Sequence, residues 1–362
     1  MPKKAALYLS ECVRSGWLSS EGPFVKRFET DFAKFIDVGH ASATSSGTGA
    51  LHLALMALGV GPGDEVILPA MTIASCYFSI WYLGAKAIPI DVDPATHNIN
   101  PSSIASKITK KTKVIMVVHL FGHPCDMDPI MELAKKHKLK VLEDAAEAHG
   151  AQYKNKKVGS IGDIAIFSFY ANKIITTGEG GMVVSNNNKY IEKINKLKSL
   201  NHSNIRFVHE GIGHNYLMSN MQAAVGLASL EEVGESIKRK QLMASLYRNG
   251  LAIIPGLQLP IEKPWAKNVF WMYAICIDPK ITKVSRKLAM TLLQEKYSIQ
   301  TRTFFFSPRT AFKKLGLYQD LHFPISEEIE KTGLYLPSGL GNTPEEFQRV
   351  IDAMNHIFFT RQ

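Results

Sequence analysis

The stretch Phe167-Ser168-Phe169-Tyr170-Ala171-Asn172-Lys173, which runs on into Thr176-Thr177-Gly178-Glu179-Gly180-Gly181, places a lysine between an apolar strand and a glycine-rich turn. A lysine in this setting can be held inside a cleft, where burial favours the neutral amine that attacks a carbonyl to form a Schiff base. The alternative is a solvated loop lysine, as most lysines of this chain must be. The residues around Lys173 indicate whether it is a buried Schiff-base lysine or a solvated loop lysine.

Strand and helix patterns alternate on both sides of this stretch. Apolar strands are predicted at 66–69, 114–120, 141–142, 164–169 and 182–184, and helices at 49–58 and 127–137. Continuous apolar strands separated by helices favour an α/β fold whose mostly parallel sheet is covered on both faces. Ligands of such sheets bind beyond the carboxyl ends of the strands.

The length of the chain, 362 residues, favours two domains. A helical stretch over 220–248 leads to a predicted strand at 270–277 and a helix at 284–297. We therefore expect a large domain over residues 1–240, with the N-terminal segment, and a smaller C-terminal α+β domain over residues 241–362.

Small residues in Ser45-Ser46-Gly47-Thr48-Gly49 stand directly before a predicted helix. They let the backbone approach a ligand, and the start of the helix offers free N–H groups to an anion. This pattern is typical of a phosphate seat, although an ordinary helix cap with flexible glycines has the same sequence. Ser168 and Phe169 alternate along a strand, so Ser168 can point into the same crevice as a phosphate donor.

Asp144 ends the strand in Val141-Leu142-Glu143-Asp144-Ala145-Ala146-Glu147. A carboxylate here can keep a pyridine nitrogen protonated, and Glu147 can reach a ring oxygen. Capping of the next helix by the same acids is the alternative. A phosphate seat, a ring-nitrogen carboxylate and a Schiff-base lysine are together what pyridoxal 5′-phosphate requires.

These motifs make the chain resemble the DegT/DnrJ/EryC1/StrS sugar aminotransferases, which have the aspartate-aminotransferase fold (fold type I of the pyridoxal-phosphate enzymes). Within that family it is most similar to the GDP-perosamine synthases, which aminate GDP-4-keto-6-deoxymannose at C4. The resemblance rests on 15–23, 46–51, 62–66, 143–150, 167–181 and the segment from Arg302 to Pro308.

The resemblance implies a role for each matching residue. Lys173 is the catalytic residue that forms the Schiff base and moves the proton, and Asp144 faces the pyridine nitrogen. Glu147 faces the ring hydroxyl. The phosphate contacts are Gly47, Thr48, Ser168 and, from the neighbouring subunit, Asn215. We therefore expect a homodimer with shared active sites.

Substrate contacts are expected at Ser20, Arg302 and Phe304. The guanidinium fork of Arg302 suits a phosphate or a carboxylate, and Phe304 with Phe305 can line a sugar or base pocket. For both phenylalanines an aromatic core is the alternative. His119 and His123 follow a strand and can touch substrate, but core or capping histidines are commoner. His209-Glu210 matches a family His-Asp pair only loosely.

Two positions depart from the family pattern. Ile73 stands where the family usually has an aromatic residue stacked on the cofactor ring, and Tyr77 is a candidate to compensate. Leu217 stands where the family has an arginine, which removes a charge near the subunit interface.

The implied reaction moves the amino group of L-glutamate to C4 of a nucleotide-linked 4-keto-6-deoxyhexose, GDP-linked and giving a perosamine-type product. UDP- and dTDP-linked sugars, with viosamine-type products, stay open. A sugar dehydratase of the same fold carries histidine in place of Lys173, so it is disfavoured. A non-enzymatic regulator is disfavoured by the complete set Asp144, Ser168 and Lys173.

Composition agrees with a cytoplasmic enzyme. The net charge of +10 is spread without a long basic block, which argues against a nucleic-acid partner and suits an anionic small molecule. The four cysteines have no metal-binding spacing and are expected to be reduced core thiols, so no metal is expected. Neither a signal peptide nor a membrane span is apparent.

Overall fold

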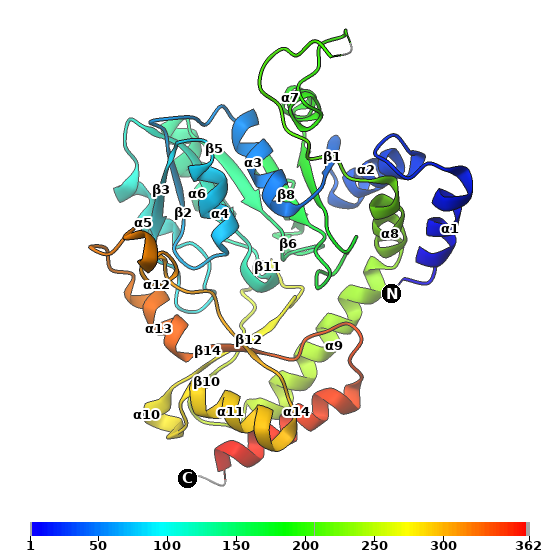
Figure 1. Ribbon diagram of the computed structural model, residues 1–362. Coiled ribbons are helices and arrows are strands. Elements are labelled where there is room, and N and C mark those ends of the chain that lie inside the picture. The colour runs from blue at the N-terminus through cyan, green and yellow to red at the C-terminus, as the bar shows by residue number, and fades with distance from the viewer. Residues whose placement is uncertain (1, 206, 360–362) are drawn as a thin grey trace.

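The computed structural model describes residues 2–205 and 207–359, and its centre is a seven-stranded sheet (Figure 1). In spatial order the strands are β1 (His40–Thr44), β9 (Gly181–Ser185), β8 (Ile164–Ser168), β5 (Lys140–Asp144), β4 (Thr112–Val118), β2 (Glu65–Pro69) and β3 (Lys86–Ile90).

Only β9 runs against the other strands. The pairs β8–β5, β5–β4, β4–β2 and β2–β3 are parallel, whereas β9 is antiparallel to both β8 and β1. The carboxyl ends of β5 and β8 therefore lie side by side at one edge of the sheet. The prediction of a mostly parallel sheet is confirmed.

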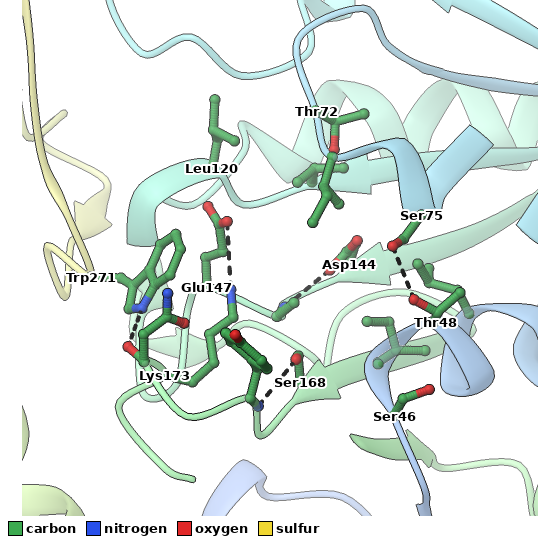
Figure 2. Close-up of a pocket in the computed structure, with 18 of the residues that line it drawn as sticks. Ser46, Thr48, Thr72, Ser75, Leu120, Asp144, Glu147, Ser168, Lys173 and Trp271 are labelled. Atoms are coloured by element: carbon green, nitrogen blue, oxygen red, sulfur yellow. Dashed lines mark hydrogen bonds and ion pairs between the residues drawn. The ribbon is translucent and has the colours of Figure 1, made fainter. Parts of the chain in front are cut away.

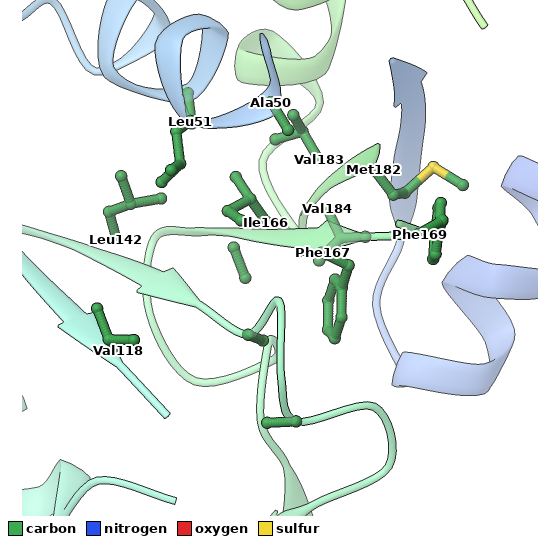
Figure 3. Close-up of a cluster of buried hydrophobic side chains, with 14 of the residues drawn as sticks. Ala50, Leu51, Val118, Leu142, Ile166, Phe167, Phe169, Met182, Val183 and Val184 are labelled. Atoms are coloured by element: carbon green, nitrogen blue, oxygen red, sulfur yellow. The ribbon is translucent and has the colours of Figure 1, made fainter. Parts of the chain in front are cut away.

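Apolar side chains of the central strands alternate between two cores. Val114 and Met116 of β4 belong to the core beneath α3 (Gly47–Ala57) and α4 (Ala74–Trp81). Ile115 and Val117 point to the opposite face, where they pack with α5 (Pro101–Ile104) and α6 (Met127–His137). Figure 3 shows part of the first core, where Ala50 and Leu51 of α3 meet Ile166 and Val183 of the sheet. Helices thus cover both faces, as continuous apolar strands require.

Further helices complete the first core. These are α1 (Ala5–Ser15), α2 (Pro23–Ile36), α7 (Asn188–Lys198) and α8 (Asn220–Glu231). A small sheet of β6 (Gln152–Tyr153), β7 (Lys156–Lys157) and β11 (Ala266–Lys267) lies outside the main sheet.

A second core forms around a four-stranded antiparallel sheet in the C-terminal part. Its strands, in spatial order, are β10 (Leu257–Gln258), β12 (Tyr273–Ile277), β14 (Gly333–Leu336) and β13 (Arg302–Thr303). It packs against α9 (Val233–Leu251), α11 (Arg286–Tyr297) and α14 (Pro344–Phe359), and the short α10 (Pro279–Thr282) follows β12. In Figure 1, α9 descends from the first core to the second.

We propose a domain division near residue 240, because the second core begins at Met243 within α9. One C-terminal segment nevertheless returns to the main sheet. It contains α12 (Pro308–Ala311) and α13 (Pro324–Thr332), and the backbone N–H groups of Ile325 and Ser326 donate to the Asp91 carboxylate.

Apart from shifts of one or two residues at element ends, two predicted elements differ from the structure. The helix expected over 220–248 is two helices, which meet at Glu232. Ser219 and Gln222 form a capping box that fixes the start of α8. The strand expected from residue 270 begins at Tyr273, because Phe270 has a left-handed φ of 48°. The helix at 127–137 is confirmed at both ends.

Candidate active site

The carboxyl ends of β5 and β8 and the start of α3 open onto one cavity of about 340 Å³ (Figure 2). Asp144 ends β5, Ser168 ends β8, and Lys173 follows in the turn before β9. The lining residues include Ser46, Gly47, Thr48, Ser75, Asp144, Glu147, Ser168 and Lys173. The site motifs, far apart in the sequence, thus share one cavity.

Lys173 lines this cavity with a side chain that is only 10% exposed. Its Nζ lies 3.5 Å from Glu147 Oε1 and 3.7 Å from the centre of the Trp271 ring. Burial lowers the pKa of Lys173, although the carboxylates of Glu147 and Asp144 act in the opposite direction. The lysine is therefore not a solvated loop residue, and its low exposure makes the neutral amine easier to form than in water.

Asp144 is fixed through both carboxylate oxygens. Oδ1 accepts a hydrogen bond from the backbone N–H of Ala146 at 3.0 Å, and Oδ2 accepts one from the Cys76 thiol at 3.2 Å. Burial raises the pKa of Asp144. The carboxylate thus has a fixed orientation toward the cavity in a place of low polarity, where it acts strongly on a nearby positive charge.

Glu147 connects the lysine to the opposite wall. Its Oε2 accepts a hydrogen bond from the backbone N–H of Phe121 at 2.8 Å, which leaves Oε1 facing Lys173. Burial raises the pKa of Glu147. The carboxyl group stays within reach of any ring held between Lys173 and Asp144.

The start of α3 is a capped helix terminus and also has the features of a phosphate-binding site. Ser46 caps the helix by accepting from the N–H of Gly49 at 3.0 Å, and Thr48 Oγ1 lies 2.9 Å from Ser75 Oγ. A Cβ on Gly47 would meet Ser168 Cβ at 2.9 Å, so only glycine allows this close approach. Hydroxyls and helix N–H groups therefore converge where an anion is favoured.

We expect Gly47→Ala to weaken binding of a phosphorylated ligand by about tenfold, because the added methyl group displaces Ser168 and the start of α3. Titration of pyridoxal 5′-phosphate followed by its absorbance measures the change. Gly61→Ala is the matched control, since a Cβ there meets no atom within 4 Å. Equal affinities of the two variants for pyridoxal 5′-phosphate would contradict a phosphate-binding site at Gly47.

Four predicted residues lie away from this cavity in the single chain. Ser20 is partly exposed, and Asn215 is exposed beside α7, paired with Ser199. Arg302 is exposed next to Tyr335, a lining residue with which it pairs across β13 and β14. Phe304 is 3% exposed and packs against Phe121, whereas its neighbour Phe305 lines the cavity.

The departures from the family pattern also have definite places. Ile73 lines the mouth of the cavity and is 45% exposed. Tyr77 does not compensate for it, because its ring is buried against Phe312 and its hydroxyl donates to the carbonyl of Ala70. Leu217 is partly exposed outside the cavity.

The candidate histidines are structural in this arrangement. His119 Nε2 lies 3.1 Å from Glu143 Oε2, and both side chains are fully buried behind the site. Burial lowers the pKa of His123 to about 4, and its Nδ1 lies 2.7 Å from the carbonyl of Pro124. His209 lies 2.8 Å from the carbonyl of Leu200 through Nδ1, while Glu210 pairs with Lys196 at the surface.

Sequence reasoning missed several lining or contacting residues. Cys76 is buried and free, as expected of all four cysteines, and its thiol also donates to Asp144. Trp271 comes from the C-terminal part of the chain and contacts Lys173. No local motif marks either residue, because each reaches the site through tertiary packing. Among the residues that the structure describes, no cluster suited to a metal ion occurs.

Comparisons with known proteins show to which family the chain is similar. The model of the DegT/DnrJ/EryC1/StrS aminotransferase family matches residues 2–355. The GDP-perosamine synthase of Caulobacter vibrioides is 40% identical, and that of Escherichia coli O157:H7 is 41% identical. Each alignment spans 97% of this chain and 94% of the relative.

A solved structure has the same fold over the whole chain. The aminotransferase from Psychrobacter cryohalolentis superposes with a TM-score of 0.93 at 32% identity, covering 99% of this chain and 98% of that one. With its fold, its cavity and its full-length match, the chain belongs to the DegT/DnrJ/EryC1/StrS aminotransferase family.

Proposed function

We propose that the chain transfers the amino group of L-glutamate to C4 of a GDP-linked 4-keto-6-deoxyhexose, which gives a perosamine-type sugar. The observation that carries this choice of substrate is the 40–41% identity to two GDP-perosamine synthases over 97% of the chain. Lys173 in the cavity, in place of the histidine of related dehydratases, supports amination.

Pyridoxal 5′-phosphate is the cofactor of this enzyme class, and the cavity fits it. Gly47 and Ser168 form a cradle that a Cβ would fill, next to the Thr48 and Ser75 hydroxyls. Asp144 offers a fixed carboxylate to a ring nitrogen, and Lys173 offers an amine. When bound, the cofactor supplies an electron sink for the carbon that loses its proton.

We infer a role for each protein group from its place in the cavity. Lys173 binds the cofactor covalently and, once released, moves a proton as a general acid and base. Asp144 keeps a proton on the ring nitrogen, and Glu147 hydrogen-bonds the ring hydroxyl. Gly47, Thr48 and Ser168 bind the phosphate. Apolar lining residues such as Leu51 and Val118 exclude water from the reacting groups.

A homodimer completes this proposal. Asn215 is exposed and so is free to reach the phosphate site of a second subunit. The neighbouring arm, residues 200–205 and 207–214, projects from α7 in Figure 1 and exposes large apolar side chains. These are Leu200, Ile205, Phe207, Val208 and Ile212. Exposed apolar patches of this kind mark contact surfaces.

Substrate recognition is assigned to three residues that lie outside the cavity of the single chain. We infer that Arg302 pairs with a substrate phosphate or carboxylate, Ser20 contacts the sugar from the shared interface, and Phe304 supports Phe305 in the pocket wall. Cytoplasmic action is part of the proposal. Among the residues described, no helix is long and apolar enough to cross a membrane.

A panel of GDP-, UDP- and dTDP-linked 4-keto-6-deoxyhexoses, each incubated with L-glutamate and the purified enzyme, tests this function. Mass spectrometry should detect an amino sugar from the GDP-linked compound at the highest rate. Turnover of only a UDP- or dTDP-linked sugar would replace the substrate and keep the reaction class. Loss of the sugar's hydroxyl without nitrogen gain would identify a dehydratase.

A further inference from the structure

Trp271 lines the site, but none of the roles proposed above involves it. Its indole ring lies in the cavity wall, and its centre is 3.7 Å from Lys173 Nζ (Figure 2). Its Nε1–H donates to the carbonyl of Asn172 at 2.8 Å, in the residue directly before the lysine. One side chain therefore contacts both the amine of Lys173 and the backbone that carries it.

The backbone of Trp271 is fixed from two sides. Its N–H donates to the carbonyl of Phe121 at 2.9 Å, and its carbonyl accepts from Lys240 Nζ at 2.7 Å. Lys240 is 2% exposed and also donates to the carbonyl of Ser338. The ring is thus held in place by the domain-joining helix α9 and by the loop that carries Phe121.

We propose that the indole face of Trp271 is the seat of the free Lys173 amine, and that it stabilises the protonated form of that amine while the lysine is not bound to the cofactor. The proposal rests on Lys173 being the Schiff-base lysine. Trp271 is then a catalytic residue supplied by the C-terminal part of the chain, and Lys240 is the positioning residue behind it.

The surroundings of Lys173 show why a contact with the indole ring matters. Burial disfavours the ammonium form, and Glu147 and Asp144 favour it. Cys76 and His149 are further titratable groups that interact with the amine. An aromatic face attracts an ammonium through its negative π surface and offers no lone pair that could accept the proton. The ring therefore sets how readily the lysine holds the proton that it moves between carbon atoms.

The test uses the full-length chain freed of cofactor and pyridoxal 5′-phosphate as the probe. Only the neutral amine attacks the aldehyde, so the rate at which the visible Schiff-base band appears follows the neutral fraction of Lys173 as pH changes. Trp271→Met keeps the site filled but removes the ring. We expect its titration midpoint to lie about 0.4 to 1 pH unit below that of the wild type.

Trp271→Phe should give an intermediate midpoint, because its smaller ring still presents a face. Trp265→Leu is the matched control, since that tryptophan packs on Tyr153 and His123 outside the cavity, and its midpoint should equal the wild type's.

An unchanged or raised midpoint in Trp271→Met would overturn the proposal, because it would mean that the ring only excludes water. Should that variant fail to fold, Trp271→Phe decides alone, and a midpoint equal to the wild type's would count against the seat. Absence of the visible band in the wild type would instead refute the role of Lys173 itself.

Discussion

Lys173→Ala protein is expected to lose at least about 10³-fold of its amination rate with L-glutamate and the GDP-linked keto sugar. The substitution removes both the covalent anchor and the group that moves the proton, and no other lysine lines the cavity among the residues described. Purified variant should also lack the visible Schiff-base band. Absorbance spectra and a coupled assay for 2-oxoglutarate measure the two effects.

Lys198→Ala is the matched control for this loss. Lys198 is also a buried lysine beside a glutamate, 3.3 Å from Glu29 Oε1, but it lies outside the cavity. Its replacement should lower the melting temperature and leave the absorbance band in place. Wild-type turnover by Lys173→Ala would end the assignment of this residue.

Asp144→Asn is expected to reduce the amination rate by about 10²-fold or more while the Schiff-base band persists. The amide keeps the size of the side chain and can still accept from the N–H of Ala146, but it carries no negative charge. A ring nitrogen without that charge loses its proton, and the ring then withdraws electrons poorly. The rate of band decay after addition of L-glutamate isolates this step from sugar binding.

Asp163→Asn serves as the control for Asp144→Asn, because Asp163 holds Lys140 and the N–H of Val141 at the far end of β5. It should affect stability and leave the half-reaction with L-glutamate unchanged. If Asp144→Asn reacted with L-glutamate as fast as the Asp163 variant, the carboxylate would have no part in the chemistry.

The sequence allowed the strand-end part of the site to be predicted, because apolar runs and the polar residues that end them are local features of the sequence. Asp144 and Ser168 each end an apolar strand of a parallel sheet, and such ends meet at one edge. Phe304 and Phe305 show where this reasoning stops. They are neighbours in sequence and both contact Phe121, but Phe304 is buried whereas Phe305 lines the cavity.

Contacts between residues far apart in the sequence could not be predicted, because they depend on tertiary packing. Cys76 meets Asp144, and Trp271 meets Lys173, through the way in which helices and loops pack on the sheet. Neither contact leaves a periodic or motif signal. Arg302 and Asn215 are exposed in the single chain, so their proposed contacts rest on the proposed second subunit and on bound substrate, which no local motif describes.

The antiparallel strand β9 has a consequence for how the loop that carries Lys173 folds. Because β9 runs back beside β8, Ser168 pairs with Gly181, and Tyr170 bridges to Gly178 within the same turn. The loop that carries Lys173 is therefore closed by contacts between near neighbours in the chain, with a small loss of loop entropy. Contacts of this kind form early in folding. An inserted residue in this turn would shift the lysine along with it, so the turn should tolerate substitutions far better than changes in length.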